Sequence, residues 1–295
     1  MAIAPPSETP AAAPPALWRP RRRRLDGVLT GLAGLCLAIA LVPLGAVIGF
    51  VVWRGGSRLD GALLTQLPPA AGLAGGGIGN ALVGTGIVVA IATLIAAPVG
   101  VLAAIYLAEF SAPGPLTRWL RFSVNVLSGV PAILAGVFVY GLLVQTRLTG
   151  YSAVAGGVAL ALLMLPLIIR TTDEALQLIP VDWRWAACSV GARRSQVVFH
   201  IVLPAALPAI VTGVTLAIAR AAGETAPLIF TALFSSFWPD GVLTPIASLA
   251  VLIYNFATAP FEPQQTLAWA AALLLLLLVL VTSAIARLTL GRRWH

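Results

Sequence analysis

Lysine is absent from this chain of 295 residues, and other chemically reactive residues are scarce, with two cysteines and two histidines. A phosphate-binding P-loop requires the motif G-x-x-x-x-G-K-[ST], which a chain without lysine cannot contain. The chain also has neither the metalloprotease motif HExxH nor the hydrolase motif G-x-S-x-G. These absences exclude ATP hydrolysis by a P-loop and argue against an enzyme.

The few cysteines and histidines do not predict a disulfide or a metal site. Cys36 falls in an apolar segment and Cys188 in a polar one, and His200 and His295 stand far apart in the chain. A metal site needs three or four such ligands at suitable spacing, which these residues do not provide. We therefore expect no metal and no other cofactor.

Charged residues are also rare, at 9% of the chain against 59% hydrophobic, and the mean hydropathy is +0.98. This composition excludes a water-soluble domain of ordinary make-up. It predicts an all-α protein that crosses a membrane several times. All 18 basic residues are arginines, which mark the cytoplasmic side of a membrane protein. We expect contact with membrane lipid and none with nucleic acid.

Six apolar segments are long enough to cross a bilayer. Their approximate ranges are 27–53, 78–109, 119–146, 151–172, 203–234 and 264–288. With both termini in the cytoplasm, thirteen arginines fall on the inner side and three on the outer side, namely Arg54, Arg58 and Arg147. This bias agrees with the positive-inside rule and leaves Arg170 and Arg220 in or near the membrane. Small residues are dense in the second segment and predict close helix packing.

Residues 1–24 are rich in proline and alanine and end in a run of arginines, without a periodic apolar pattern. We expect a disordered cytoplasmic tail there, followed by a transmembrane domain over 25–295. A secretory signal is the alternative, but the apolar run that follows is too long for a signal core. The outer loops, 54–77 and 235–263, are too short to be domains, and a short helix is expected around Ile246–Asn255.

A polar segment over 180–203 interrupts the apolar sequence. Its pattern predicts a short amphipathic helix, a chain reversal at Gly191 and a second short helix that ends before Pro204. Such a knob on the cytoplasmic side fits a groove on another protein, with the small residues Ala186 and Ala187 at the contact. Amphipathicity alone leaves an alternative, a helix pair that lies on the membrane surface without a partner.

Two opposite charges, Arg220 and Glu224, fall within the fifth apolar segment. Their spacing of four places them on one helical face, in the outer half of the membrane. Charges at that depth are costly and mark either a solute pathway or an ion pair that stabilises the bundle. In a pathway, the guanidinium of Arg220 would contact a passing anion, and Glu224 would keep the anion from binding too tightly.

Arg170 lies near the inner boundary of the fourth apolar segment. Its long side chain could extend to the lipid headgroups, or it could take part in the pathway. Either Asp173 or Glu174 could be its partner. The residues alone leave both roles open.

The polar segment resembles the EAA loop of ABC importer permeases, whose consensus is E-A-A, three residues, G, nine residues and I-x-L-P. The matching residues are Ala186, Ala187, Gly191, Ile201, Leu203 and Pro204. Trp185 stands where the family usually has glutamate, so no salt bridge is expected from that position. The resemblance implies a coupling-helix loop that docks on an ATP-binding subunit through Trp185, Ala186, Ala187, Gly191 and Ala192.

Four further segments are similar to the PstA-type permeases of phosphate-specific ABC importers. They are GGGIGNALVGTG with IYLAEF (75–110), GVPAILAGVFVYG (129–141), LPLIIRTTDEALQLIP (165–180) and ARAAGETAPLIFTALF (219–234). The similarity implies a type I importer fold with six transmembrane helices in the inner (plasma) membrane, and a permease domain that moves inorganic phosphate into the cytoplasm. It also implies that Arg220, Glu224 and Arg170 lie on the phosphate pathway.

The same resemblance implies the partners of such a permease. They are a homologous second permease that completes a heterodimer, two ATP-binding subunits on the cytoplasmic side, an extracytoplasmic phosphate-binding protein, and phosphate itself. Two other functions stay open. One is a permease of the same architecture for molybdate or sulfate, and the other is a channel or scaffold that uses the polar segment for binding but does not cycle.

Overall fold

The structure is a computed structural model that describes residues 19–291, with side chains described for residues 25–284. No strand occurs within that range, which agrees with the predicted all-α class. The chain divides into two units, Met1–Phe50 and Val51–His295, and each is described by itself.

The first unit holds most of one long helix, α1 (Arg19–Gly55). The helix begins at Arg19, so the prediction of a disordered tail over 1–24 is wrong for its last six residues, 19–24. The physical reason is that Pro20 lies in the first turn, where a missing N–H costs nothing, and the arginines after it favour a helix. The remainder of the expected tail, residues 1–18, lies outside the described residues.

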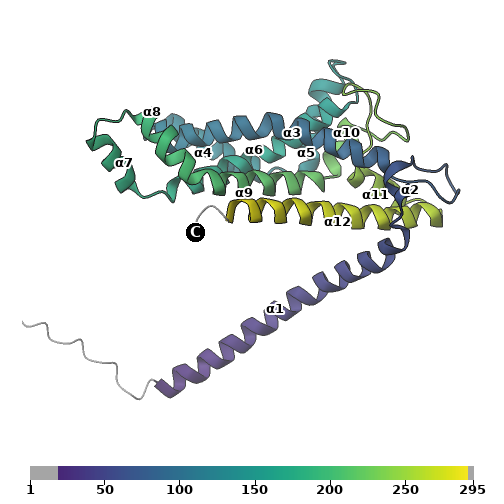
Figure 1. The fold of residues 1–295 in the computed structure, drawn as a ribbon, viewed down its shortest axis with the longest axis horizontal. Helices are drawn as coiled ribbons and strands as arrows, with labels where there is room; N and C mark the ends of the chain where they lie inside the picture. The colour runs from purple at the N-terminus through teal and green to yellow at the C-terminus, as the bar shows by residue number, and fades with distance from the viewer. Residues whose placement is uncertain (1–18, 292–295) are drawn as a thin grey trace, which may run out of the picture. The chain divides into compact units, whose positions relative to one another are not determined.

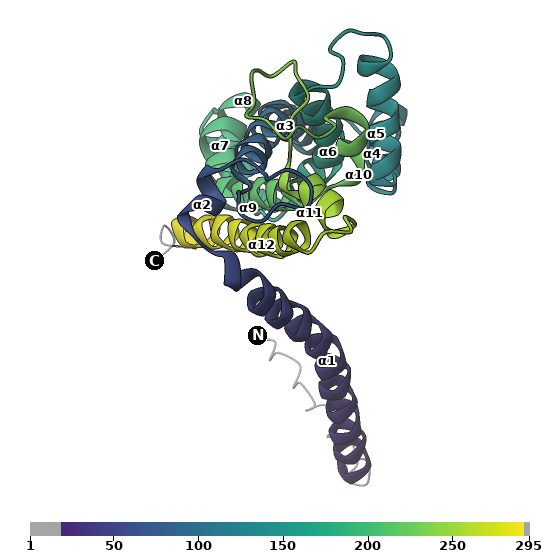
Figure 2. The same ribbon diagram turned by 90° about the vertical axis from the view of Figure 1, so that its right-hand side faces the viewer.

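In the second unit, four long helices run side by side (Figure 1): α3 (Gly79–Ile105), α6 (Ala153–Gln177), α9 (Leu203–Ala222) and α12 (Glu262–Gly291). The short helices α7 (Val181–Ser189) and α8 (Arg194–Val197) lie at one end, called here the turn end. The opposite end, the loop end, carries α2 (Gly61–Thr65) and α11 (Leu249–Ala257), as Figures 1 and 2 show. A 3₁₀ turn, Gly56–Arg58, precedes α2, and π-helical turns continue three segments, at Tyr106–Phe110, Tyr140–Val144 and Val198–Val202.

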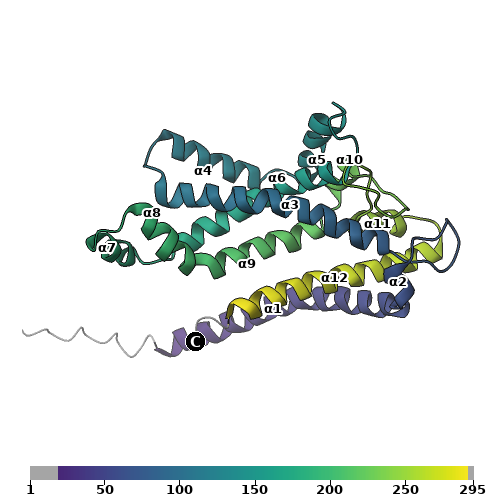
Figure 3. The same cartoon turned by 45° about the horizontal axis from the view of Figure 1, so that its top comes forward.

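The third predicted span, 119–146, is not one helix. α4 (Pro115–Ser128) and α5 (Ala132–Val139), with the π-helical turn that follows α5, meet at an angle of 103°. The break follows from Gly129, which ends α4, and from Pro131, which cannot donate a backbone hydrogen bond and restricts the residue before it. Figure 3 shows α4 beside α3 and α6 toward the turn end, and α5 beside α10 (Ala226–Thr231) toward the loop end.

The fifth predicted span, 203–234, is also broken. α9 ends at Ala222 with Gly223 as its cap, and α10 begins at Ala226 with Pro227 in its first turn. Glu224 therefore lies beyond the end of the helix that carries Arg220. Within the described residues, five helices are long and apolar enough to cross a membrane, and the bent α4–α5 pair makes up to six. The predicted number of spans agrees with this.

Small residues allow the close helix packing that the sequence predicts. At Gly84 of α3, an added Cβ would lie 1.9 Å from the carbonyl oxygen of Ala247. The main core cluster lies along α3 and α6 and includes Val88, Leu160 and Ile168, all fully buried. The side chains of α3 and α6 thus form the centre of the second unit.

Buried polar side chains fasten the loop end. Asn80 Nδ2 donates to the Ser235 carbonyl oxygen at 2.7 Å, and the Thr85 hydroxyl accepts from the Leu249 backbone N–H at 2.8 Å. The second contact holds the start of α11. This helix, Leu249–Ala257, confirms the short helix expected around Ile246–Asn255. The loops at this end are therefore packed onto α3.

Replacing Gly84 by valine should destabilise the fold, because the new Cβ has no room beside the Ala247 carbonyl. We expect a loss of about 2 kcal/mol or more, as for overpacked cores, and a lower apparent Tm of the purified protein in detergent. Gly86→Val is the matched control, since a Cβ at Gly86 meets nothing within 4 Å. Equal Tm values for the two variants would contradict the close contact.

Candidate functional site

The polar segment folds as the predicted hairpin of two short helices. Gly191 has φ +90°, a conformation that favours glycine, and it lies between α7 and α8. The Gly191 N–H donates to the Cys188 carbonyl oxygen at 3.0 Å, and the Ala192 N–H donates to that of Ala187 at 3.2 Å. These bonds close the end of α7 and reverse the chain direction.

The hairpin presents one face to the outside and one to the bundle. Trp185 and Val190 are 66% and 84% exposed, and Ala186 and Gly191 are exposed as well. Ala187 is buried against Leu176 and Val197, and Ala192 is half-buried at the same cluster. Ala186 and Ala187 therefore differ in exposure, because adjacent helical positions point about 100° apart: the side chain of Ala187 packs inward and that of Ala186 faces outward.

Arg184 holds α7 to the bundle, a contact that the sequence analysis missed. Its Nη2 lies 2.6 Å from Glu109 Oε1, and its Nε lies 3.3 Å from Glu109 Oε2. It also donates to the carbonyl oxygens of Ile179 at 2.7 Å and Leu176 at 2.9 Å. The Glu109 side chain is only 8% exposed, so removing Arg184 would leave a buried carboxylate without a cation.

A second cation strengthens the same attachment. The guanidinium carbon of Arg194, at the start of α8, lies 5.8 Å from the centre of the Phe110 ring. Glu109 and Phe110 both belong to the π-helical turn at the end of α3, Tyr106–Phe110. The signal in the sequence was an acidic residue at the end of an apolar span, in the segment IYLAEF, together with two arginines in the polar segment.

The predicted pathway residues Arg170 and Arg220 line one cavity of about 250 Å³. Arg170 comes from α6 and Arg220 from the last turn of α9. The other lining residues belong to α4, α6 and the bend between α4 and α5: Leu127, Ser128, Val130, Leu163, Pro166 and Leu167. Two arginines thus line one cavity, and guanidinium donors brought together in this way suit an oxyanion.

Each of these arginines has a carboxylate partner four residues later. Arg170 Nε donates to Glu174 Oε1 at 3.1 Å, and both side chains are more than 60% exposed. Arg220 Nε lies 3.5 Å from Glu224 Oε1, with side-chain exposures of 65% and 21%. Glu224 is thus close to Arg220 but does not line the cavity, where Arg170 and Arg220 meet.

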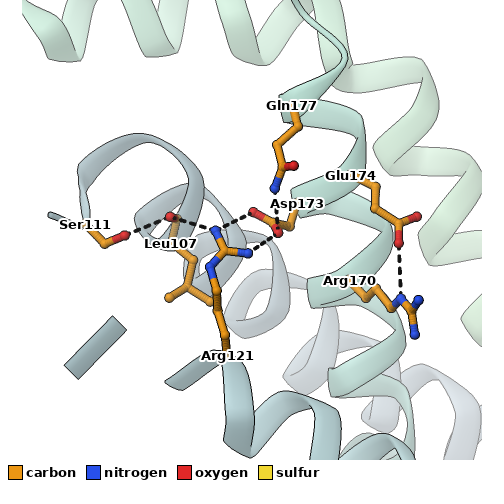
Figure 4. Close-up of polar contacts among 7 residues, drawn as sticks. All are labelled: Leu107, Ser111, Arg121, Arg170, Asp173, Glu174 and Gln177. Carbon is orange, nitrogen blue, oxygen red and sulfur yellow. Dashed lines mark hydrogen bonds and ion pairs between the residues drawn. The ribbon is translucent and has the colours of Figure 1, made fainter. Parts of the chain in front are cut away.

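Asp173, the other possible partner of Arg170, pairs with Arg121 of α4 instead (Figure 4). Arg121 Nη1 lies 2.5 Å from Asp173 Oδ2, and Nη2 lies 3.3 Å from Asp173 Oδ1. The same Nη2 donates to the Leu107 carbonyl oxygen at 3.2 Å, and Gln177 Nε2 donates to Asp173 Oδ2 at 2.9 Å. This cluster joins the turn-end portions of α3, α4 and α6.

Residues 96–294 match the family described as binding-protein-dependent transport system inner membrane component. The chain belongs to this family. As a binding-protein-dependent permease, it is a multi-pass protein of the inner membrane.

Several curated relatives are named as PstA phosphate transport system permease proteins. The protein from Yersinia pestis is 40% identical over 94% of this chain and 93% of its own length. The protein from Haemophilus influenzae is 41% identical over 92% of this chain and 94% of its own length. PstA 1 from Mycobacterium tuberculosis is 35% identical over 95% of each chain. The predicted resemblance to PstA-type permeases is confirmed.

Solved ABC transporters share the permease fold. A chain of a bacterial alginate ABC transporter has a TM-score of 0.63 and 14% identity, covering 92% of this chain and 96% of that chain. A chain of the inward-facing MetNI methionine ABC transporter has a TM-score of 0.56 and 22% identity, covering 72% of this chain and 92% of that chain. These likenesses confirm the predicted type I importer fold.

Replacing Arg184 by glutamine should loosen the hairpin, because Glu109 would keep a charge without a partner. Breaking such a buried pair costs about 3 kcal/mol, which corresponds to roughly hundredfold faster amide exchange of α7. Hydrogen exchange measured by mass spectrometry over 181–200 tests this.

The control for this experiment is Arg193→Gln, because Arg193 is exposed and the substitution keeps its backbone hydrogen bonds, from its N–H to the Gln196 side chain and from the Val197 N–H to its carbonyl oxygen. Combining Arg184→Gln with Glu109→Gln should restore part of the protection, since the uncompensated charge is then removed. Unchanged exchange in Arg184→Gln would show that the ion pair does not hold the hairpin.

Proposed function

We propose that this chain is the permease subunit of an ATP-driven ABC importer that moves inorganic phosphate into the cytoplasm. The observation that carries the proposal is the cavity shared by Arg170 and Arg220, in a chain that is similar to PstA proteins over nearly its whole length. The relatives are named for phosphate transport, which favours phosphate over molybdate or sulfate.

The turn end faces the cytoplasm in this proposal, and both termini lie on that side. Five arginines support the orientation, because they belong to segments at the turn end: Arg118, Arg121, Arg184, Arg193 and Arg194. Arg54, Arg58 and Arg147 belong to segments that precede α2 or α6, away from that end. The excess of arginine on one side follows the positive-inside rule.

Phosphate passes through the Arg170–Arg220 cavity. Each arginine is paired with a glutamate, so the pathway carries little net charge of its own. An arriving anion accepts hydrogen bonds from Arg220 in place of Glu224. The nearby Glu224 carboxylate then repels the bound anion, so the anion is held only weakly. Such a site favours transit, and selection among anions is left to the extracytoplasmic binding protein.

The partners follow from the family and from the surface of the chain. A homologous second permease completes the pathway, and two ATP-binding subunits supply the energy, since a chain without lysine has no P-loop. The exposed face of the hairpin, with Trp185, Ala186, Val190 and Gly191, docks on an ATP-binding subunit. A non-cycling channel is not favoured, because the family is that of binding-protein-dependent transport systems.

Replacing Arg220 by glutamine should abolish phosphate uptake while the complex still assembles, because the amide keeps the polar shape but removes the charge. The measurement is uptake of radiolabelled phosphate by the reconstituted complex, with sulfate and molybdate as competitors. Arg147→Gln is the control, since Arg147 lies in the turn before α6 and outside the cavity. Uptake at the normal rate in Arg220→Gln would remove Arg220 from the pathway, and stronger competition by sulfate or molybdate than by unlabelled phosphate would overturn the substrate.

A further inference from the structure

A second hollow, of about 120 Å³, lies next to the Arg170–Arg220 cavity and shares Arg170 with it. Its polar lining residues are Arg121 and Asn125 of α4 and Arg170 and Asp173 of α6. Ser128, which lines the first cavity, stands three residues after Asn125, which stands four after Arg121. These spacings place all three on one face of α4, as a polar stripe that links the two hollows.

The donors in the second hollow are only partly used. Arg170 donates one hydrogen bond, from Nε, and within residues 25–284 its two terminal nitrogens have none. The Asn125 side chain likewise makes no hydrogen bond in the part of the chain whose side chains are described. Arg121 is fully engaged, with both terminal nitrogens on Asp173 and one also on Leu107. The second hollow therefore holds unused hydrogen-bond donors, on Arg170 and Asn125. They lie beside Arg121, whose terminal nitrogens are bound to the Asp173 carboxylate.

We propose that Arg121, Asn125 and Arg170 form a second binding site for a tetrahedral oxyanion, on the turn-end side of the first cavity, and that Asp173 closes this site by pairing with Arg121 when no anion is present. The inference rests on the proposed function and adds a step to it. Because Arg170 lines both hollows, an anion that moves from Arg220 to Arg121 can stay in contact with at least one guanidinium group throughout.

The carboxylate of Asp173 is the competitor for the anion. Its side chain is 13% exposed and accepts from both terminal nitrogens of Arg121, the geometry in which guanidinium also binds an oxyanion. An incoming anion must displace Asp173, and the return of Asp173 displaces the anion in turn. The site therefore binds weakly and releases the anion toward the turn end.

The test measures whether a bound anion protects a cysteine in the second hollow from chemical labelling. Val124 lines it without being one of the proposed ligands, so Val124→Cys leaves the site intact. The variant is made with Cys36→Ser and Cys188→Ser and assembled in the whole transport complex in inside-out vesicles. An anionic, membrane-impermeant methanethiosulfonate reagent then labels it with increasing concentrations of phosphate or sulfate. Ser123→Cys, the next position on α4, does not line the hollow and is the control.

We expect phosphate to slow labelling of Val124→Cys and to leave Ser123→Cys unaffected. Protection by sulfate but not phosphate would support the oxyanion site and overturn phosphate as the substrate. If the parent complex takes up phosphate and neither anion protects Val124→Cys, the second site is disproved while the proposed function stands.

Two further substitutions test the role of Asp173 in the same assay. Asp173→Asn should lower the protecting phosphate concentration about tenfold, because the competing charge is removed, and Arg121→Gln should abolish protection. Arg118→Gln is the control, since Arg118 lies one turn away on α4 and lines a different hollow, with Trp119 and Phe122. Unchanged protection in both Asp173→Asn and Arg121→Gln would overturn the proposal.

Discussion

The ion pair between Arg184 and Glu109 is the contact on which the arrangement of the turn end depends. A carboxylate that is 8% exposed at the end of an apolar helix needs a cation, and Arg184 also satisfies two carbonyl oxygens at the end of α6. One side chain thus fastens α7 to both α3 and α6. The hairpin, with its exposed face, is held as an extension of the bundle.

The same π-helical turn of α3 also contacts the proposed second anion site. Leu107, two residues before Glu109, accepts a hydrogen bond from Arg121, and Arg121 pairs with Asp173. A displacement of the hairpin would therefore act on the carbonyl group that holds Arg121. This gives a continuous set of contacts from the surface proposed to meet the ATP-binding subunit to the pathway residues of α4 and α6.

Composition and hydropathy were sufficient to predict the fold class, the positions of most spans and the hairpin, because apolar length and a polar interruption are local properties. They could not predict the breaks at Gly129 and Gly223. The sequence on both sides of Gly129 is mostly apolar, and the spacing of Arg220 and Glu224 around Gly223 also fits one unbroken helix. The partners of Arg184 and Arg121 lie 75 and 52 residues away in the chain, so no local pattern joins them. Arg170 and Arg220 were predicted singly, and only the packing of α6 and α9 places them at one cavity.

The central claim is that the hairpin and the end of α3 move as one body, and a distance measurement tests it most directly. Cys188 and a cysteine introduced at the exposed Tyr106 can carry spin labels in a Cys36→Ser background. Pulsed EPR of the assembled complex should give the same narrow distance distribution without nucleotide and with ATP bound, and a broader one in Arg184→Gln. A distance that changes on ATP binding in the chain with Arg184 intact would contradict the account.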